Sequence, residues 1–139
     1  MADTDTGAWR MERRILIVDD YPTNLDICKL VLRGAGYDCR TFERGTDALA
    51  ALQAWVPDLV LSDLEMPHLH GLRLLQEVRA IAPGIPVVIM SGRSGEETVR
   101  DAMARGAAAF IAKPFSPDSL LAAIRRVLAR TDGCPAVGG

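Results

Sequence analysis

The stretch RILIVDD (residues 14–20) is an uninterrupted apolar run that ends in two acids. Two further runs have the same character, LVLS at residues 59–62 and VVIM at 87–90. Apolar runs without in-out alternation are typical of strands buried on both faces, as in a parallel sheet covered by helices. Residues 38–42 and 108–111 are weaker strand candidates, and the first of these reads as an edge strand.

Helical patterns follow each of these runs. Their apolar residues recur at spacings of three and four, as at Leu120, Ile124, Val127 and Leu128 in the last one. Strands that alternate with helices predict a (βα)5 α/β fold, a doubly wound parallel sheet with right-handed crossovers. We expect one domain over residues 13–130, an N-terminal tail at 1–12 and a flexible C-terminal tail at 131–139.

The composition excludes several functional classes. The chain has 139 residues, of which 49% are hydrophobic, and its formal net charge is −2. A duplex-DNA binder normally carries a basic surplus, so we expect no direct contact with nucleic acid. No apolar run approaches the roughly 20 residues of a membrane span, and the N-terminus has no signal-peptide core. Three scattered cysteines indicate neither a disulfide framework nor a zinc site. These features predict a cytoplasmic protein without a membrane partner.

Polar side chains mark the ends of four predicted strands. They are Asp19, Asp20, Asp63, Ser91 and Lys113. The carboxyl ends of parallel strands meet at one edge of a sheet, so we expect these groups to surround one cleft. Taken singly, each is more simply a turn, cap or surface residue. Ser94 fits a capping box for the following helix, which leaves Ser91 without an obvious structural role.

The chemistry of this set points to phosphoryl groups. Two carboxylates 4 Å apart repel each other by about 4 kcal/mol at an effective dielectric constant near 20, so a proton or a cation must offset the charge. Oxygen ligands without Cys or His favour Mg²⁺, with Mn²⁺ as the alternative. A lysine and a hydroxyl are suitable further partners for a phosphoryl group. One of the carboxylates is then able to attack phosphorus and form an aspartyl phosphate.

The combination resembles a known family. The matching segments are RILIVDD (14–20), DLVLSDLEMPHLHG (58–71), PVVIMSG (86–92) and GAAAFIAKPF (106–115). They are similar to the receiver domains of response regulators in two-component signalling, the CheY-like family, over residues 14–130. The resemblance implies a flavodoxin-like sheet of order 2-1-3-4-5. It also implies a switch that accepts a phosphoryl group from a histidine kinase or a histidine phosphotransfer protein.

The resemblance assigns the metal and the acceptor. Asp63 is the expected phosphoacceptor. Asp20 and Asp63 are expected to bind Mg²⁺ together with the backbone carbonyl of Glu65, and Asp19 to act through a metal-bound water. Lys113 is expected to pair first with Asp63 and then with the phosphoryl group, next to a cis peptide bond with the following proline.

The resemblance also assigns the switch. Ser91 is expected to hydrogen-bond the arriving phosphoryl group, and Phe110 to turn inward in response, although a plain core aromatic reads the same way in sequence. Glu65 and Arg93 occupy positions that tune access of water to the acyl phosphate, and we expect an ion pair between them. His68 and His70 fit solvated loop residues better than a transition-metal pair.

These assignments predict a signalling switch rather than an enzyme, whose chemistry is limited to its own phosphorylation and slow dephosphorylation. We expect a single-domain regulator that docks onto a protein through its fourth helix, fifth strand and fifth helix, as a monomer or a phosphorylation-dependent dimer. The alternative is the receiver of a hybrid kinase or of a larger response regulator. A phosphohydrolase of the haloacid-dehalogenase type requires an Asp where Glu65 stands. A flavin carrier requires a Ser/Thr/Gly-rich phosphate loop in place of Asp19-Asp20, and a degenerate receiver would lack the full polar set.

Overall fold

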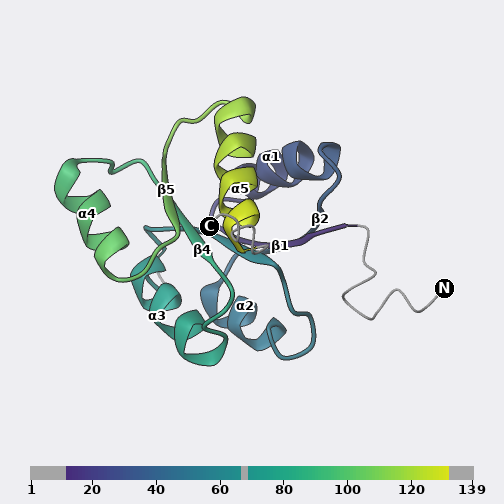
Figure 1. The fold of residues 1–139 in the computed structure, drawn as a ribbon, viewed down its shortest axis with the longest axis horizontal. Coiled ribbons are helices and arrows are strands. Elements are labelled where there is room, and N and C mark those ends of the chain that lie inside the picture. The colour runs from purple at the N-terminus through teal and green to yellow at the C-terminus, as the bar shows by residue number, and fades with distance from the viewer. Residues whose placement is uncertain (1–11, 67–68, 132–139) are drawn as a thin grey trace.

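The computed structural model describes residues 12–66 and 69–131, which form one sheet and its covering helices. The strands are β1 (Arg14–Val18), β2 (Asp38–Phe42), β3 (Leu59–Asp63), β4 (Val87–Ser91) and β5 (Ala109–Ala112). The helices are α1 (Pro22–Gly34), α2 (Gly45–Ala51), α3 (Gly71–Ile81), α4 (Glu96–Ala104) and α5 (Pro117–Thr131). All strands pair in parallel in the order β2-β1-β3-β4-β5, which confirms the predicted fold (Figure 1). No helix in the described ranges is long and apolar enough to cross a bilayer.

The central strands are buried on both faces because helices cover both sides of the sheet. In β1, Ile15 and Ile17 pack in the apolar cluster under α1 and α5. Leu16 and Val18 point the other way, into the cluster shared with α2 and α3. Figure 1 shows these two helix pairs on opposite sides of the sheet. The uninterrupted apolar runs therefore follow from the alternation of side chains across a sheet with two covered faces.

The register of the strands brings their carboxyl ends to one edge. Val18 pairs with Ser62, one residue before the end of β3. Asp63 pairs with Met90, and Ser91 at the end of β4 pairs with Ala112 at the end of β5. The loops that follow β1, β3, β4 and β5 therefore all leave the sheet at the same edge.

Two helix boundaries differ from the sequence-based expectation. The spacing of Ala48, Leu52 and Trp55 in the sequence predicts a second helix that continues to Trp55. In the structure α2 ends at Ala51, and a turn follows in which the Trp55 N–H donates to the Ala51 carbonyl. The predicted cap at Ser94 is wrong, because Gly95 occupies the N-cap of α4 and no side chain caps this helix. The predicted tails lie almost wholly outside the described residues, so the domain limits 13 and 130 remain predictions.

A buried tryptophan lies at the opposite edge of the sheet, where the strands begin. Trp55 is 5% exposed, and two guanidinium groups lie over its ring, Arg14 at 5.4 Å and Arg40 at 4.8 Å from the centroid. Such contacts add a cation–π attraction to the packing of the indole. Nearby, the Arg14 N–H donates to Asp58 Oδ2 at 2.8 Å, which ties the start of β1 to the residue that precedes β3.

Candidate functional site

Three carboxylates meet where β1 and β3 end. One oxygen from each of Asp19, Asp20 and Asp63 lies within 4.8 Å of the others. Asp19 is 1% exposed and Asp63 is 4% exposed, whereas Asp20 is half-buried. The Tyr21 N–H donates to Asp19 Oδ1 at 2.9 Å and fixes that side chain within the turn into α1. The site therefore concentrates negative charge where little water is available to screen it.

Lys113 joins the acidic group from the loop after β5. Its Nζ donates to Asp63 Oδ1 at 2.9 Å and to Asp19 Oδ2 at 3.0 Å. The Lys113–Pro114 peptide bond is cis, as the resemblance implied. Burial of the ammonium group lowers the pKa of Lys113, but hydrogen bonds to Asp63 and Asp19 outweigh burial and raise the pKa above its ordinary value. Lys113 is therefore a charged partner that bridges two of the three acids.

Asp63 is difficult to ionise in this setting. The pKa of its carboxyl group is raised from 3.8 to about 6, because burial, together with the charge of Asp19, outweighs the opposing hydrogen bond from Lys113. The desolvation of a buried carboxylate and the repulsion of a second one act in the same direction. An additional positive charge at the site would relieve both, and this is the main electrostatic requirement of the arrangement.

The donor set fits a hard divalent cation. The clustered oxygens belong to carboxylates, and such ligands suit Mg²⁺ or Mn²⁺ and not the softer transition metals. Asp20 and Asp63 both belong to this cluster, and their expected direct role at the ion stays a prediction. Both oxygens of Asp19 accept hydrogen bonds, from Tyr21 and Lys113, and its expected role through a metal-bound water stays a prediction. The expected contribution of the Glu65 carbonyl stays a prediction.

The predicted contact between Glu65 and Arg93 takes a different form. Ser91 is fully buried at the end of β4, and its hydroxyl donates to Glu65 Oε2 at 2.7 Å. The same hydroxyl accepts the Arg93 N–H at 2.8 Å. Within the described residues the Glu65 carboxylate therefore pairs with Ser91 and not with the Arg93 guanidinium. The expected ion pair with Arg93 is thus not formed in this arrangement, and it stays a prediction for the phosphorylated protein.

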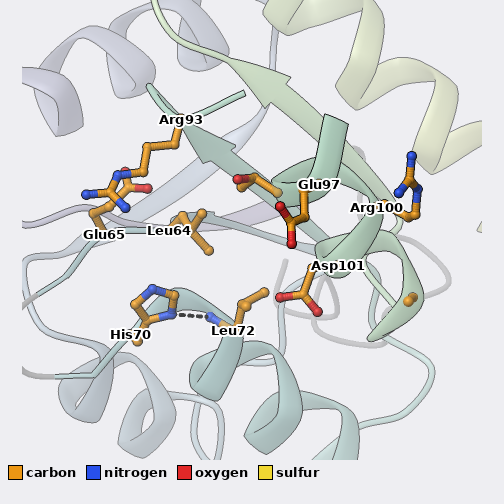
Figure 2. A pocket seen from close by; sticks show the side chains of 10 residues that line it. Leu64, Glu65, His70, Leu72, Arg93, Glu97, Arg100 and Asp101 are labelled. Atoms are coloured by element: carbon orange, nitrogen blue, oxygen red, sulfur yellow. Dashed lines mark hydrogen bonds between the residues drawn. The ribbon is translucent and has the colours of Figure 1, made fainter. Parts of the chain in front are cut away.

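Glu65 and Arg93 nevertheless line one cavity of about 600 Å³ between the loop after β3, α3 and α4. Figure 2 shows both side chains at one side of this cavity, opposite Asp101 and Arg100 of α4. A second cavity of about 320 Å³ lies beside Lys113 and is lined from α1 and the loop after β5. The second cavity therefore reaches the acidic site itself, whereas the first one borders the Glu65 and Arg93 loops beside it.

His70 and Phe110 occupy different roles in the structure. His70 is the N-cap of α3, where its Nδ1 accepts the Leu72 N–H at 3.3 Å, so the expectation of a plain loop residue missed a capping role (Figure 2). Its position directly before a helical pattern was the available signal. His68 lies outside the described residues. Phe110 is half-buried against the apolar cluster under α2 and α3, and its switch role stays a prediction.

A glycine holds the loop after β3 against the sheet. The Gly71 N–H donates to the Leu64 carbonyl at 2.8 Å. A Cβ at this position would lie 2.7 Å from Leu64 Cα and would also collide with the Asp63 carbonyl oxygen. Only glycine permits this close approach of α3 to the backbone of the acceptor strand.

Known proteins have a similar sequence and the same fold. The family model described as the response regulator receiver domain matches residues 15–125. The chain belongs to this family. A CheY-like response regulator receiver domain protein from Methanospirillum hungatei has a similar structure, with a TM-score of 0.82 and 30% identity over 87% of this chain and 97% of that one. The chain is thus a receiver domain of two-component signalling.

The similar curated proteins are longer than this chain. The DNA-binding response regulator MtrA of Mycolicibacterium paratuberculosis is 38% identical over 126 residues, which cover 91% of this chain and 56% of MtrA. The DNA-binding transcriptional regulator NtrC of Salmonella typhimurium is 38% identical over 119 residues, which cover 85% of this chain and 25% of NtrC. The receiver therefore spans about half of one relative and a quarter of the other.

Proposed function

We propose that this receiver is a phosphorylation switch in which Asp63 accepts a phosphoryl group from the phosphohistidine of a histidine kinase or a phosphotransfer protein. The observation that carries the proposal is the position of the Asp63 carboxylate, which is buried at the end of β3 between two other acids and the Lys113 ammonium group. A nucleophilic carboxylate, a cation partner and an acidic pair for a metal are the groups that transfer to an aspartate requires.

In the transfer step an oxygen of Asp63 attacks phosphorus while the bond from phosphorus to the imidazole nitrogen breaks. The electron pair of that bond stays on the imidazole of the donor. Lys113 is within hydrogen-bond distance of Asp63 and is placed to neutralise charge on the phosphoryl oxygens as they arrive. Mg²⁺ held by Asp20 and Asp63 would offset the remaining negative charge. In the separate dephosphorylation step water attacks phosphorus, the bond from phosphorus to the Asp63 oxygen breaks, and inorganic phosphate and the free Asp63 carboxylate are formed.

The cavity beside Lys113 supports the approach of a protein donor. It is lined by Asp19 and Lys113 from the site, and by Asn24 and Ile27 of α1. Ile27 is 48% exposed, so an apolar side chain stands at the rim of a charged cleft. This combination suits a protein surface that carries a phosphohistidine.

The output is proposed for the face formed by α4, β5 and α5, because Ser91 and the loop into α4 respond to the phosphoryl group. In one arrangement this face docks onto a separate protein, as a monomer or in a phosphorylation-dependent dimer. The length of the relatives favours the alternative, a receiver that controls other parts of a larger regulator. In both, the receiver itself does not read DNA, acts in the cytoplasm and performs no chemistry beyond its own phosphorylation and dephosphorylation.

The decisive experiment is incubation with acetyl phosphate and Mg²⁺, followed by measurement of the intact mass. We expect the wild-type chain to gain one phosphoryl group, and the gain to disappear in Asp63→Asn and when EDTA replaces Mg²⁺. Asp26→Asn, the same change at an exposed position of α1, is the matched control and should be labelled like the wild type. Equal labelling of Asp63→Asn and the wild type would place the acceptor elsewhere.

A further inference from the structure

The Ser91 hydroxyl is fully engaged before any phosphoryl group arrives. It donates its proton to Glu65 Oε2 at 2.7 Å and accepts the Arg93 N–H at 2.8 Å, while the serine itself has no exposed surface. A short hydrogen bond from a hydroxyl to a carboxylate is among the stronger ones in proteins. The resting position of Ser91 is therefore set by two contacts that involve neither Asp63 nor Lys113.

A hydroxyl carries one proton, and two acceptors compete for it. In the proposed function, on which this inference rests, Ser91 donates to a phosphoryl oxygen on Asp63. That bond and the bond to Glu65 exclude each other, because one O–H group cannot donate fully to both. We infer that Glu65 is a positioning residue, a resting-state latch whose carboxylate holds the Ser91 hydroxyl and must release it before the switch turns on.

The released carboxylate has space and a partner. Phosphorylation replaces the single charge of Asp63 with about −1.5 to −2, which repels the nearby Glu65 carboxylate. Glu65 faces the cavity of about 600 Å³, and Arg93 lines the same cavity (Figure 2). The ion pair between Glu65 and Arg93 that the sequence suggested thus describes the second position of the latch.

The latch also has a direct connection to the moving loop. The Arg93 N–H is anchored on the Ser91 oxygen, so a change in the orientation of that oxygen changes the anchor of the loop between β4 and α4. Glu65 belongs to the loop after β3, and Arg93 to the loop after β4. The single proton of Ser91 therefore couples two neighbouring loops.

The test measures the affinity for beryllofluoride, a phosphoryl mimic, in the presence of Mg²⁺. A buried hydrogen bond to a charged group changes an equilibrium constant by about tenfold or more. Because Glu65 is only half-buried, we expect Glu65→Ala to increase the affinity for beryllofluoride by about three- to tenfold. Glu65→Gln keeps an oxygen acceptor but loses the charge, and should tighten binding less than Glu65→Ala.

A double-mutant cycle separates the latch from simple charge removal. In a Ser91→Ala background the hydroxyl is absent, so Glu65→Ala should change beryllofluoride affinity by less than about twofold if Glu65 acts through Ser91. The same gain in both backgrounds would show that Glu65 acts only by repelling the anion, and would overturn the latch. If the wild type binds no beryllofluoride, the proposed function itself fails.

A second measurement needs no phosphoryl group. In the unliganded protein, Glu65→Ala should increase hydrogen exchange of the Arg93 amide by about threefold or more, because the oxygen that accepts this N–H loses its own anchor. Glu97→Ala is the control, since Glu97 is an exposed acid of α4 that lines the same cavity. An Arg93 amide that exchanges equally in the wild type and Glu65→Ala would overturn the latch whatever the outcome with beryllofluoride.

Discussion

Replacement of Asp63 by Asn should stabilise the protein in the absence of divalent cations. Asp63 is 4% exposed, and burial raises the pKa of its carboxyl group from 3.8 to about 6. Above pH 6 the folded state must therefore hold a carboxylate that the unfolded state accommodates more easily. Asparagine has nearly the same shape and still offers Lys113 an acceptor oxygen, but it adds no charge to the acidic group.

The size of the effect follows from the difference between the two pKa values. About two pKa units at about 1.4 kcal/mol each give up to about 3 kcal/mol at neutral pH. The sign follows from proton binding: between pH 4 and 6 the folded Asp63 retains a proton that the unfolded chain has lost. The preference of the folded state for protonated Asp63 therefore stabilises the protein in full below about pH 4. This stabilisation is lost as the pH rises through about 6 and the carboxyl group ionises.

Urea denaturation in EDTA at several pH values measures this contribution. We expect Asp63→Asn to exceed the wild type in free energy of unfolding by about 1 to 3 kcal/mol at about pH 7.5, and by about half as much at about pH 5. Asp26→Asn, at an exposed site, should stay within about 0.5 kcal/mol of the wild type throughout. An Asp63→Asn variant that is no more stable at pH 7.5, or whose advantage does not shrink toward pH 5, would refute the account of the acidic group.

Two further predictions concern the metal and the loop after β3. Mg²⁺ at ten times its dissociation constant should stabilise the wild type by about 1.4 kcal/mol, and Asp20→Asn should remove most of this gain in a thermal melt because it removes one ligand charge; an equal gain in both proteins would remove Asp20 from the metal site. Gly71→Ala should lower the free energy of unfolding by about 2 kcal/mol or more and also reduce phosphorylation by acetyl phosphate, because its Cβ would collide with backbone atoms of Asp63 and Leu64. If Gly71→Ala had the wild-type free energy of unfolding and the wild-type extent of phosphorylation, α3 would be able to move away from β3 with little loss of stability.

The sequence predicted the sheet and the central residues of the site for a physical reason. Leu59 to Leu61 are apolar on successive positions because helices cover both faces of β3, and such a run has few alternative structures. Asp63 then stands out as the first acid after an apolar run. Once parallel pairing is assumed, topology places Lys113 at the same edge of the sheet as Asp63, and the resemblance implied the direct pairing of these two residues.

The contacts between loops were not predictable in the same way. Glu65 lies in the loop after β3 and Ser91 at the end of β4. Whether the carboxylate meets a hydroxyl or a guanidinium there depends on distances of a few ångströms that the sequence does not encode. Their opposite charges led the sequence analysis to expect an ion pair between Glu65 and Arg93. In the structure the Glu65 carboxylate instead accepts a hydrogen bond from the Ser91 hydroxyl. Helix ends were equally ambiguous: Trp55 continues the apolar spacing of α2 but packs from a turn beyond its end.

The arginine-covered tryptophan has a practical consequence as an optical reporter. Trp55 lies at the edge of the sheet where the strands begin, and the acids and Lys113 lie where the strands end. The fluorescence of its indole should change strongly when the chain unfolds and water reaches the ring. It should change little when Asp63 is phosphorylated. With Trp9 replaced by Phe, fluorescence from this one side chain would give stability measurements free of interference from events at the opposite edge.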